Sequence, residues 1–196
     1  MRARLIYSKR GGACFVPHIA LAQIFSRSAL RSGLSLIMTQ GFSPRAKISF
    51  APELPAGVVA LNEPVDMYFL DDVHDDIAAL MNESLPEGFH VSRVLFPDEN
   101  SPSLGKMCKY AEYLIRNTEG HDLHEHARNF FGASVFRMSE LDEWLRITLT
   151  EPAQNPIGGL VKYLKAENVI AGWHEMNIVR VSIGGYDLEG DCVCLK

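Results

Sequence analysis

The sequence predicts an α+β protein made of two ferredoxin-like units, each with the order strand, helix, strand, strand, helix, strand and an antiparallel sheet that carries its helices on one face. Three observations lead to this prediction. Residues 1–98 alternate short apolar runs with two amphipathic segments in that order. Residues 99–106 lie in the polar stretch PDENSPSLGK and have the composition of a linker. Residues 107–196 then repeat the order, so we expect an N-terminal basic unit, a linker and a C-terminal unit.

The first unit is expected to open with a strand and a helix. Pro17 suits the first position of that helix, and apolar residues follow it at spacings of three and four. Gly33 is placed to end it. The expected apolar stripe consists of Ile19, Leu21, Ile24, Phe25, Ala29 and Leu30. Strands are expected at 2–8, 35–39, 64–70 and 89–96, and a second helix at 74–85. Residues 47–61 contain Pro52 and Pro55, which favour an irregular hairpin over a central strand.

The second unit is expected to repeat the first in pattern, with little identity of residues. Strands are expected at 110–116, 134–138, 144–150 and 176–183, and helices at 121–131 and 156–166. A unit of this kind leaves one sheet face free to meet another sheet, a nucleic acid or another subunit. Since the architecture hosts many unrelated activities, the fold alone does not decide the function.

Composition favours a cytosolic protein. Of the 196 residues, 47% are hydrophobic, which is enough to bury a core. No apolar run approaches the roughly 18 residues of a membrane span, and no apolar stretch of a signal peptide follows the N-terminal cations. The four cysteines, at 14, 108, 192 and 194, lack the paired spacing of a zinc site and are read as free thiols. We expect no cofactor and no membrane partner, and the oligomeric state stays open.

Charge is distributed unevenly along the chain, although the net charge is only -5. Residues 1–52 carry eight Lys and Arg and no acid, whereas residues 53–100 carry eleven acids and a single cation, Arg93. Such asymmetry indicates one positive and one negative face. The alternative is that the two blocks lie side by side in the fold and neutralise each other.

The acid-free block has the residue types that a single-stranded RNA ligand requires, because cations bind phosphates and aromatic rings stack on bases. The expected phosphate contacts are Lys9, Arg10, Arg27, Arg31, Arg45 and Lys47. The expected loop-shaping residues are Gly11, Gly12, Gly41 and Pro44, and Phe42 is the expected exposed aromatic. The alternative is a solvated basic surface whose aromatic side chains belong to the core.

The same stretch resembles the N-terminal part of the bacterial radical-SAM-linked family, a domain of unknown function. The likeness rests on Lys9 to Gly12, on His18, on the run Gln40-Gly41-Phe42-Ser43-Pro44 with Lys47-Ile48-Ser49 behind it, and on Leu54-Pro55-Ala56-Gly57. It implies a helper of a separate cobalamin-binding radical SAM protein, acting on RNA or a ribosome-related substrate. This chain has Ala20 where the family often has an acid, and Arg45 where it often has a second histidine. It also lacks a Cys-x3-Cys-x2-Cys motif, so the partner would hold any iron–sulfur cluster.

These observations favour a non-catalytic RNA-binding or RNA–protein-binding accessory module. One alternative is an RNA-processing endonuclease in which His18 is the general acid or base, since a histidine titrates near neutral pH. Another is a protein-binding adaptor whose basic face docks an acidic partner. His121 and His124 are three residues apart, yet an exposed polar helix start explains them better than a metal site.

Overall fold

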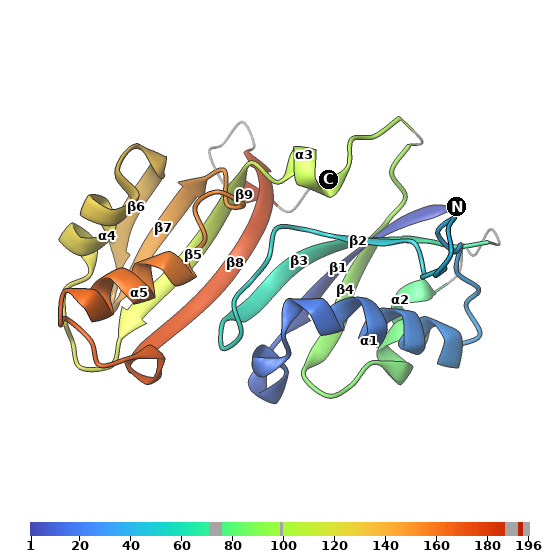
Figure 1. Cartoon of the computed structure of the whole chain (residues 1–196), viewed down its shortest axis with the longest axis horizontal. Coiled ribbons are helices and arrows are strands. Elements are labelled where there is room, and N and C mark those ends of the chain that lie inside the picture. The colour runs from blue at the N-terminus through green and yellow to red at the C-terminus, as the bar shows by residue number, and fades with distance from the viewer. Residues whose placement is uncertain (71–75, 99, 187–191, 194–196) are drawn as a thin grey trace.

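The computed structural model describes residues 1–70, 76–98, 100–186 and 192–193 (Figure 1). The first half contains β1 (Arg2–Lys9), η1 (Gly11–Phe15), α1 (His18–Arg31), β2 (Ile48–Phe50), β3 (Val59–Tyr68), α2 (Ile77–Ser84) and β4 (Phe89–Leu95). After α3 (Leu104–Met107), the second half contains β5 (Tyr110–Asn117), α4 (His124–Phe131), η2 (Gly132–Ser134), β6 (Val135–Leu141), β7 (Trp144–Thr150), α5 (Gly158–Ala166), η3 (Trp173–Glu175), β8 (Met176–Tyr186) and β9 (Cys192–Val193).

The strands form one sheet in the order β4-β1-β3-β8-β5-β7-β6, with β2 also on β3 and β9 on β8. The α+β class is confirmed, but the expectation of purely antiparallel sheets was wrong, because β3 and β8 pair in parallel at Val59↔Val179 and Ala60↔Arg180. The short β2 explains this pairing. It pairs with β3 only between Val65 and Met67, so it leaves the first residues of β3 open to β8.

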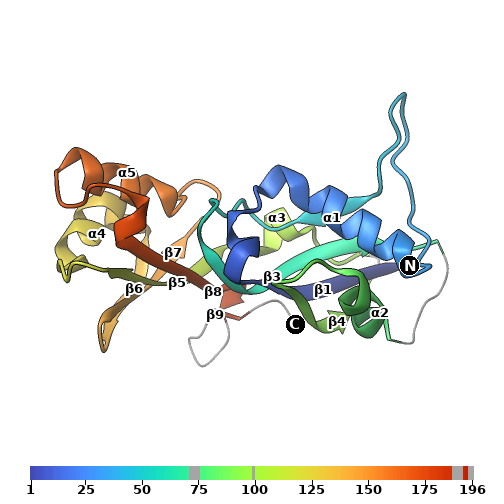
Figure 2. The same ribbon diagram turned by 90° about the horizontal axis from the view of Figure 1, so that it is seen from below.

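The helices bury one face each against the sheet. Leu21, Phe25 and Ala29 of α1 are buried in a core with residues of α2, β1 and β3. A second core lies under α4 and α5. Figure 2 shows α1, α4 and α5 on the same side of the sheet. The apolar stripe of α1 is narrower than predicted, because Ile19 is 88% exposed and Leu30 is 64% exposed.

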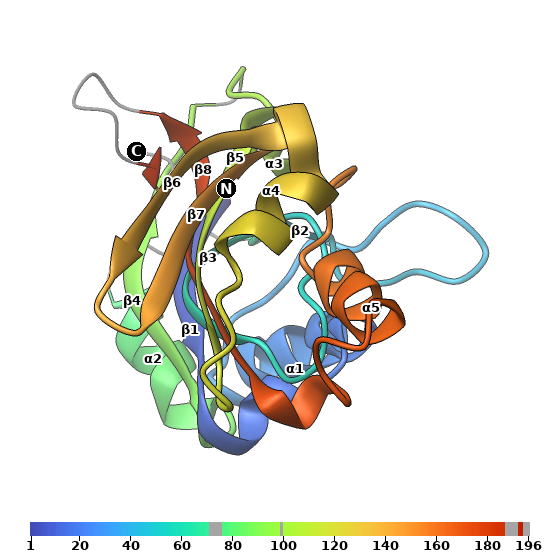
Figure 3. The same ribbon diagram turned by 90° about the vertical axis from the view of Figure 1, so that its left-hand side faces the viewer.

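Residues 35–39 do not form the predicted strand, and only isolated bridges pair Leu36 with Phe69 and Met38 with Ala46. Residues 37–47 instead form a hairpin, called the finger below, which projects from the body of the molecule (Figures 2 and 3). The helix predicted over 74–85 begins at Ile77, and residues 74 and 75 of that prediction lie outside the described residues. Among the helices of the described ranges, none has the length and apolar character needed to cross a membrane.

Candidate nucleic-acid interface

Backbone hydrogen bonds hold the finger in its hairpin shape. The Lys47 amide donates to the Ile37 carbonyl at 2.8 Å, and the Thr39 amide donates to the Arg45 carbonyl at 2.7 Å. The Thr39 hydroxyl also accepts from the Arg45 amide at 3.1 Å. Gly41 has a φ of +140°, a conformation that side-chain-bearing residues rarely adopt, so the sequence fixes the turn at the tip. These hydrogen bonds close the stem of the finger below the tip residues 40–44.

The side chains of residues 38–45, at and near the tip of the finger, face solvent. Phe42 is fully exposed, with a relative accessibility of 109%, and Pro44 and Arg45 are exposed beside it. The Lys47 Nζ lies 4.2 Å from the centre of the Tyr68 ring, which orients its ammonium group at the base of the finger. Arg45 makes no side-chain hydrogen bond or ion pair with a residue that the structure describes. A cation and an aromatic ring are thus presented together with no acid between them.

Two further predicted residues lie on the exposed side of α1. Arg27 and Arg31 are four residues apart and share that side. Arg31 Nη2 donates to the Ser84 carbonyl at 2.6 Å and to the Ser28 hydroxyl at 3.1 Å, while the residue stays exposed. The finger rises beside the C-terminal end of α1 in Figure 2, so Arg31 lies near its base.

Three cations of the basic block are withdrawn from solvent. Arg2 and Arg4 both bind Asp66, at 2.6 Å and 2.8 Å. In this cluster, cations of residues 1–52 are neutralised by an acid of residues 53–100, which is the alternative that the sequence left open. Lys9 is only 2% exposed, and its Nζ donates to the Val16 carbonyl at 3.3 Å. We leave Lys9 out of any ligand contact because a buried ammonium cannot reach a phosphate.

Arg10, Gly11 and Gly12 lie at the opposite end of α1 from the finger. The Arg10 amide donates to the Gly88 carbonyl at 2.8 Å, and the loop borders an open hollow that Glu87 also lines. A helix of 14 residues is about 21 Å long. The structure therefore brings Arg31 and the finger residues to one end of α1 and places the Gly11-Gly12 loop at the other.

Arg180, which was not among the predicted site residues, joins the two halves at the parallel pairing of β3 and β8. The guanidinium is 1% exposed. Its Nε donates to Glu63 Oε1 at 2.7 Å, a second bond runs from Nη2 to the other carboxylate oxygen, and Nη2 donates to the Pro52 carbonyl at 3.0 Å. Burial alone would lower the pKa of Arg180, but Glu63 and Tyr113 outweigh it and the pKa is raised. An arginine between two valines, Val179 and Val181, in a predicted strand was the available signal.

His18, the candidate catalytic residue, lies close to this seam. It is half-buried at the start of α1, with its ring centre 5.6 Å from that of Phe50. Burial lowers the pKa of His18, and the charges of Arg180 and Lys9 act in the same direction, whereas Glu53 and Glu63 oppose them. The imidazole is therefore neutral near pH 7 and can accept a proton. Its place near the N-terminal end of α1 separates it from the finger.

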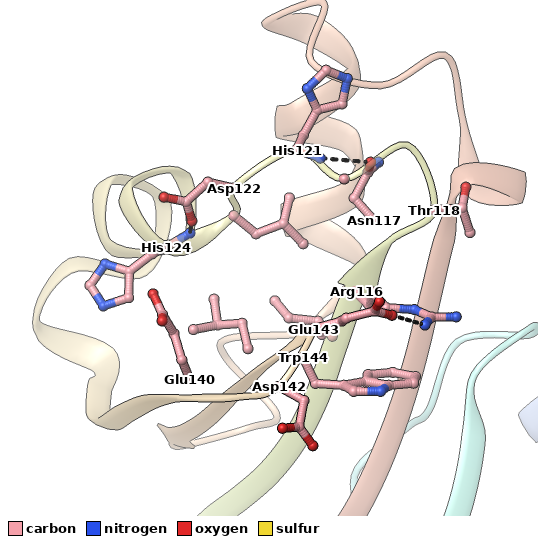
Figure 4. Close-up of a pocket in the computed structure, with 14 residues that line it drawn as sticks. Arg116, Asn117, Thr118, His121, Asp122, His124, Glu140, Asp142, Glu143 and Trp144 are labelled. Carbon is pink, nitrogen blue, oxygen red and sulfur yellow. Dashed lines mark hydrogen bonds and ion pairs between the residues drawn. The ribbon is translucent and has the colours of Figure 1, made fainter.

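A separate pocket of about 440 Å³ lies in the second half (Figure 4). His121 and His124 both line it, but Figure 4 shows the His121 ring pointing away from the cavity. Across the described residues, no group of three or more His, Cys, Asp and Glu side chains has the arrangement of a metal site. Cys14 and Cys108 are free and buried, while the side chains at 192 and 194 lie outside the described residues.

One comparison with known proteins decides the family. The model of a family described as "Uncharacterized protein conserved in bacteria (DUF2344)" matches residues 2–153. The chain belongs to this family. The matched part of this DUF2344 protein contains the finger, α1 and the pocket, whereas β8 with Arg180 lies beyond it. The expectation of a bacterial family with no established function is confirmed. A search of curated proteins finds none that matches.

Proposed function

We propose that this DUF2344 protein binds single-stranded RNA with the finger and the adjoining C-terminal end of α1. The observation that carries the proposal is the fully exposed Phe42 at the tip of a hydrogen-bonded hairpin that also presents Arg45 and Lys47. The ring of Phe42 is free to stack on a base, and such stacking would remove apolar surface from water beside two cations that can bind phosphates.

The proposed contacts are of two kinds, ionic contacts with phosphates and stacking on a base. Arg45 and Lys47 bind phosphates along the strand, and Arg27 and Arg31 extend the positive surface down α1. Phe42 stacks on a base, which requires no particular sequence because every base has a π face. Gly41 and Pro44 fix the shape of the loop and thereby how closely it approaches the RNA backbone. Arg10, Gly11 and Gly12 would contact only an RNA long enough to reach the far end of α1.

We further propose that the protein acts in the cytosol as an accessory module that presents RNA, or an RNA–protein substrate, to a separate radical SAM enzyme. The resemblance of residues 9–57 to the radical-SAM-linked family supports this role. We also propose that each half of the chain is a ferredoxin-like unit. The shared strand orders β4-β1-β3-β2 and β8-β5-β7-β6 support this reading.

The proposal is tested by titrating the purified chain with fluorescently labelled single-stranded and double-stranded RNA of the same sequence. Anisotropy measured at several salt concentrations gives the affinity and its salt dependence. We expect tighter binding of the single strand and a linear fall of log K with log salt. Equal affinity for single-stranded and double-stranded RNA would show that Phe42 does not stack on an unpaired base. No binding at low salt would overturn the proposal.

A second candidate function is RNA cleavage with His18 as the general base, and the lowered pKa of His18 favours it. Purified protein that cuts RNA, and a His18→Ala variant that binds RNA without cutting it, would establish this activity. A protein-binding adaptor is the third candidate. Exposure of Phe15 and Ile19 near the other end of α1 favours it. A partner that stays bound after nuclease treatment would distinguish the adaptor from the RNA-binding module.

A further inference from the structure

We propose that the pocket of the second half binds an organic cation with an aliphatic stem, that is, an alkylguanidinium or alkylammonium group. The pocket has a volume of about 440 Å³, within the range of roughly 300–1,000 Å³ that small-molecule sites occupy. The end of β5, residues 117–123 and the β6–β7 hairpin enclose it (Figure 4). It lies in the other half of the chain from the finger, so the inference does not depend on the RNA proposal.

The apolar residues that line the pocket favour a ligand with an apolar part. Ile115, Leu123 and Leu145 line it, and each of these side chains is at least nine-tenths buried. Trp144 is half-buried and adds an aromatic wall. The three aliphatic side chains therefore form the closed floor of the pocket, and the apolar surface open to a ligand is that of Trp144. A short alkyl chain would cover this ring and gain hydrophobic free energy.

The charged residues at the rim of the pocket favour a ligand with a positive charge. Arg116 is the single Lys or Arg among the lining residues, and its Nη1 lies 2.7 Å from Glu143 Oε2. Its guanidinium also lies 5.0 Å from the centre of the Trp144 ring. This ion pair engages Nη1 of Arg116 and fixes one rim of the pocket, while the buried Nε of Arg116 has no hydrogen-bond partner among the described residues. The preference for a cation therefore rests on the carboxylates of the other rim.

At the other rim, Glu140 and His124 both line the pocket, and Figure 4 draws the Glu140 carboxylate beside the His124 ring. Glu140 has no ion pair with a Lys or Arg of the described ranges. Asp122 adds a carboxylate whose Oδ1 accepts from the His124 amide at 2.8 Å. The charge inside the pocket is therefore negative after the Arg116 pair is counted. An entering cation would place its stem against Trp144 and its charged head against Glu140.

The test uses the two tryptophans of the chain. A Trp173→Phe variant leaves Trp144 as its sole tryptophan, so its fluorescence reports on the pocket. The probes are pentylguanidinium, its neutral isostere pentylurea, and a capped Gly-Arg-Gly peptide. We expect a saturable change with pentylguanidinium at millimolar concentrations or below, and none with pentylurea. Glu140→Gln should weaken the binding about tenfold, because a hydrogen bond to a charged group is lost. Glu167→Gln, an exposed acid outside the lining, is the matched control and should leave it unchanged.

The peptide distinguishes the source of the cation. Tighter binding of the peptide than of pentylguanidinium would assign the site to an arginine side chain of a protein, and the reverse order would assign it to a small amine or guanidine. The proposal is overturned if neither cation gives a saturable change, if pentylurea binds as well as pentylguanidinium, or if a folded Glu140→Gln variant binds as the parent does. Thermal unfolding of each variant checks that it is folded.

Discussion

Arg180 on β8 and Glu63 on β3 form a buried ion pair across the parallel strands that join the two halves, with the Arg180 Nε 2.7 Å from Glu63 Oε1. The same guanidinium donates to the Pro52 carbonyl, so it also holds the loop between β2 and β3 over the seam. One side chain from near the end of the described chain thus fixes a loop that follows the finger in sequence.

We expect Arg180→Ala to lower the free energy of unfolding by about 3–5 kcal/mol, because it leaves the Glu63 carboxylate buried without its partner. Urea unfolding followed by far-UV circular dichroism measures this loss. A double variant with Arg180→Met and Glu63→Leu should be more stable than Arg180→Ala, since no charge is then left buried. A double variant as unstable as the single one would show that packing, and not the ion pair, holds the seam.

We expect the stability to depend on pH through His18. The pKa of His18 is lowered in the folded chain from its ordinary value of 6.5. Below pH 6.5 the unfolded chain therefore binds more protons than the folded one, and the free energy of unfolding falls as pH drops toward the folded pKa. Above pH 6.5 this contribution is fully present. Urea midpoints between pH 7.5 and pH 5 should fall less in His18→Gln than in the wild type. An NMR titration of His18 with a midpoint at or above 6.5 would contradict the assignment.

Gly88 should tolerate no side chain. Its φ is +87°, and an added Cβ would lie 2.5 Å from the Arg10 carbonyl oxygen. We expect Gly88→Ala to reduce the free energy of unfolding by roughly 1–3 kcal/mol, the cost of one strained backbone position. Gly33→Ala is the matched control, because Gly33 has a similar φ of +75° and nothing lies within 4 Å of the added Cβ. A loss of equal size in both variants, measured by urea unfolding, would mean that the contact with Arg10 is not the cause.

Phe42 should matter for RNA and not for folding. Because its side chain is fully exposed, Phe42→Ala is expected to leave the urea midpoint unchanged. It should weaken single-stranded RNA binding by about 1–3 kcal/mol, the value of one stacked base. Phe15→Ala removes a phenylalanine that is 73% exposed at η1, near the other end of α1, and is the matched control. Equal RNA affinity of the Phe42→Ala variant and the wild type would exclude stacking at the finger.

Local patterns predicted much of the fold. The strand predicted over 144–150 has the bounds of β7, and Gly33, with a φ of +75°, follows the end of α1 as expected. Pairing between distant segments could not be predicted in this way. The parallel contact of β3 with β8 depends on how far β2 extends along β3, and no local pattern encodes that length.

In the candidate site, too, local features could be predicted from the sequence, whereas contacts between distant residues could not. The exposure of Phe42 and Arg45 agrees with the turn that Gly41 and Pro44 predict, because connecting loops run over the protein surface. The burial of Lys9 and the pairing of Arg2 and Arg4 with Asp66 depend on residues that tertiary structure brings in from elsewhere. Counting charges along the sequence therefore overestimated the positive surface.

The most direct test of the RNA proposal is the salt dependence of RNA binding by an Arg45→Ala/Lys47→Ala double variant. If both cations bind phosphates, the variant binds single-stranded RNA more weakly, and the slope of log K against log salt becomes shallower by about 1.4. A control variant with Arg128→Ala and Lys162→Ala removes two exposed cations of the second half and should keep the wild-type slope. An affinity and a slope equal to those of the wild type in the finger variant would contradict the proposal.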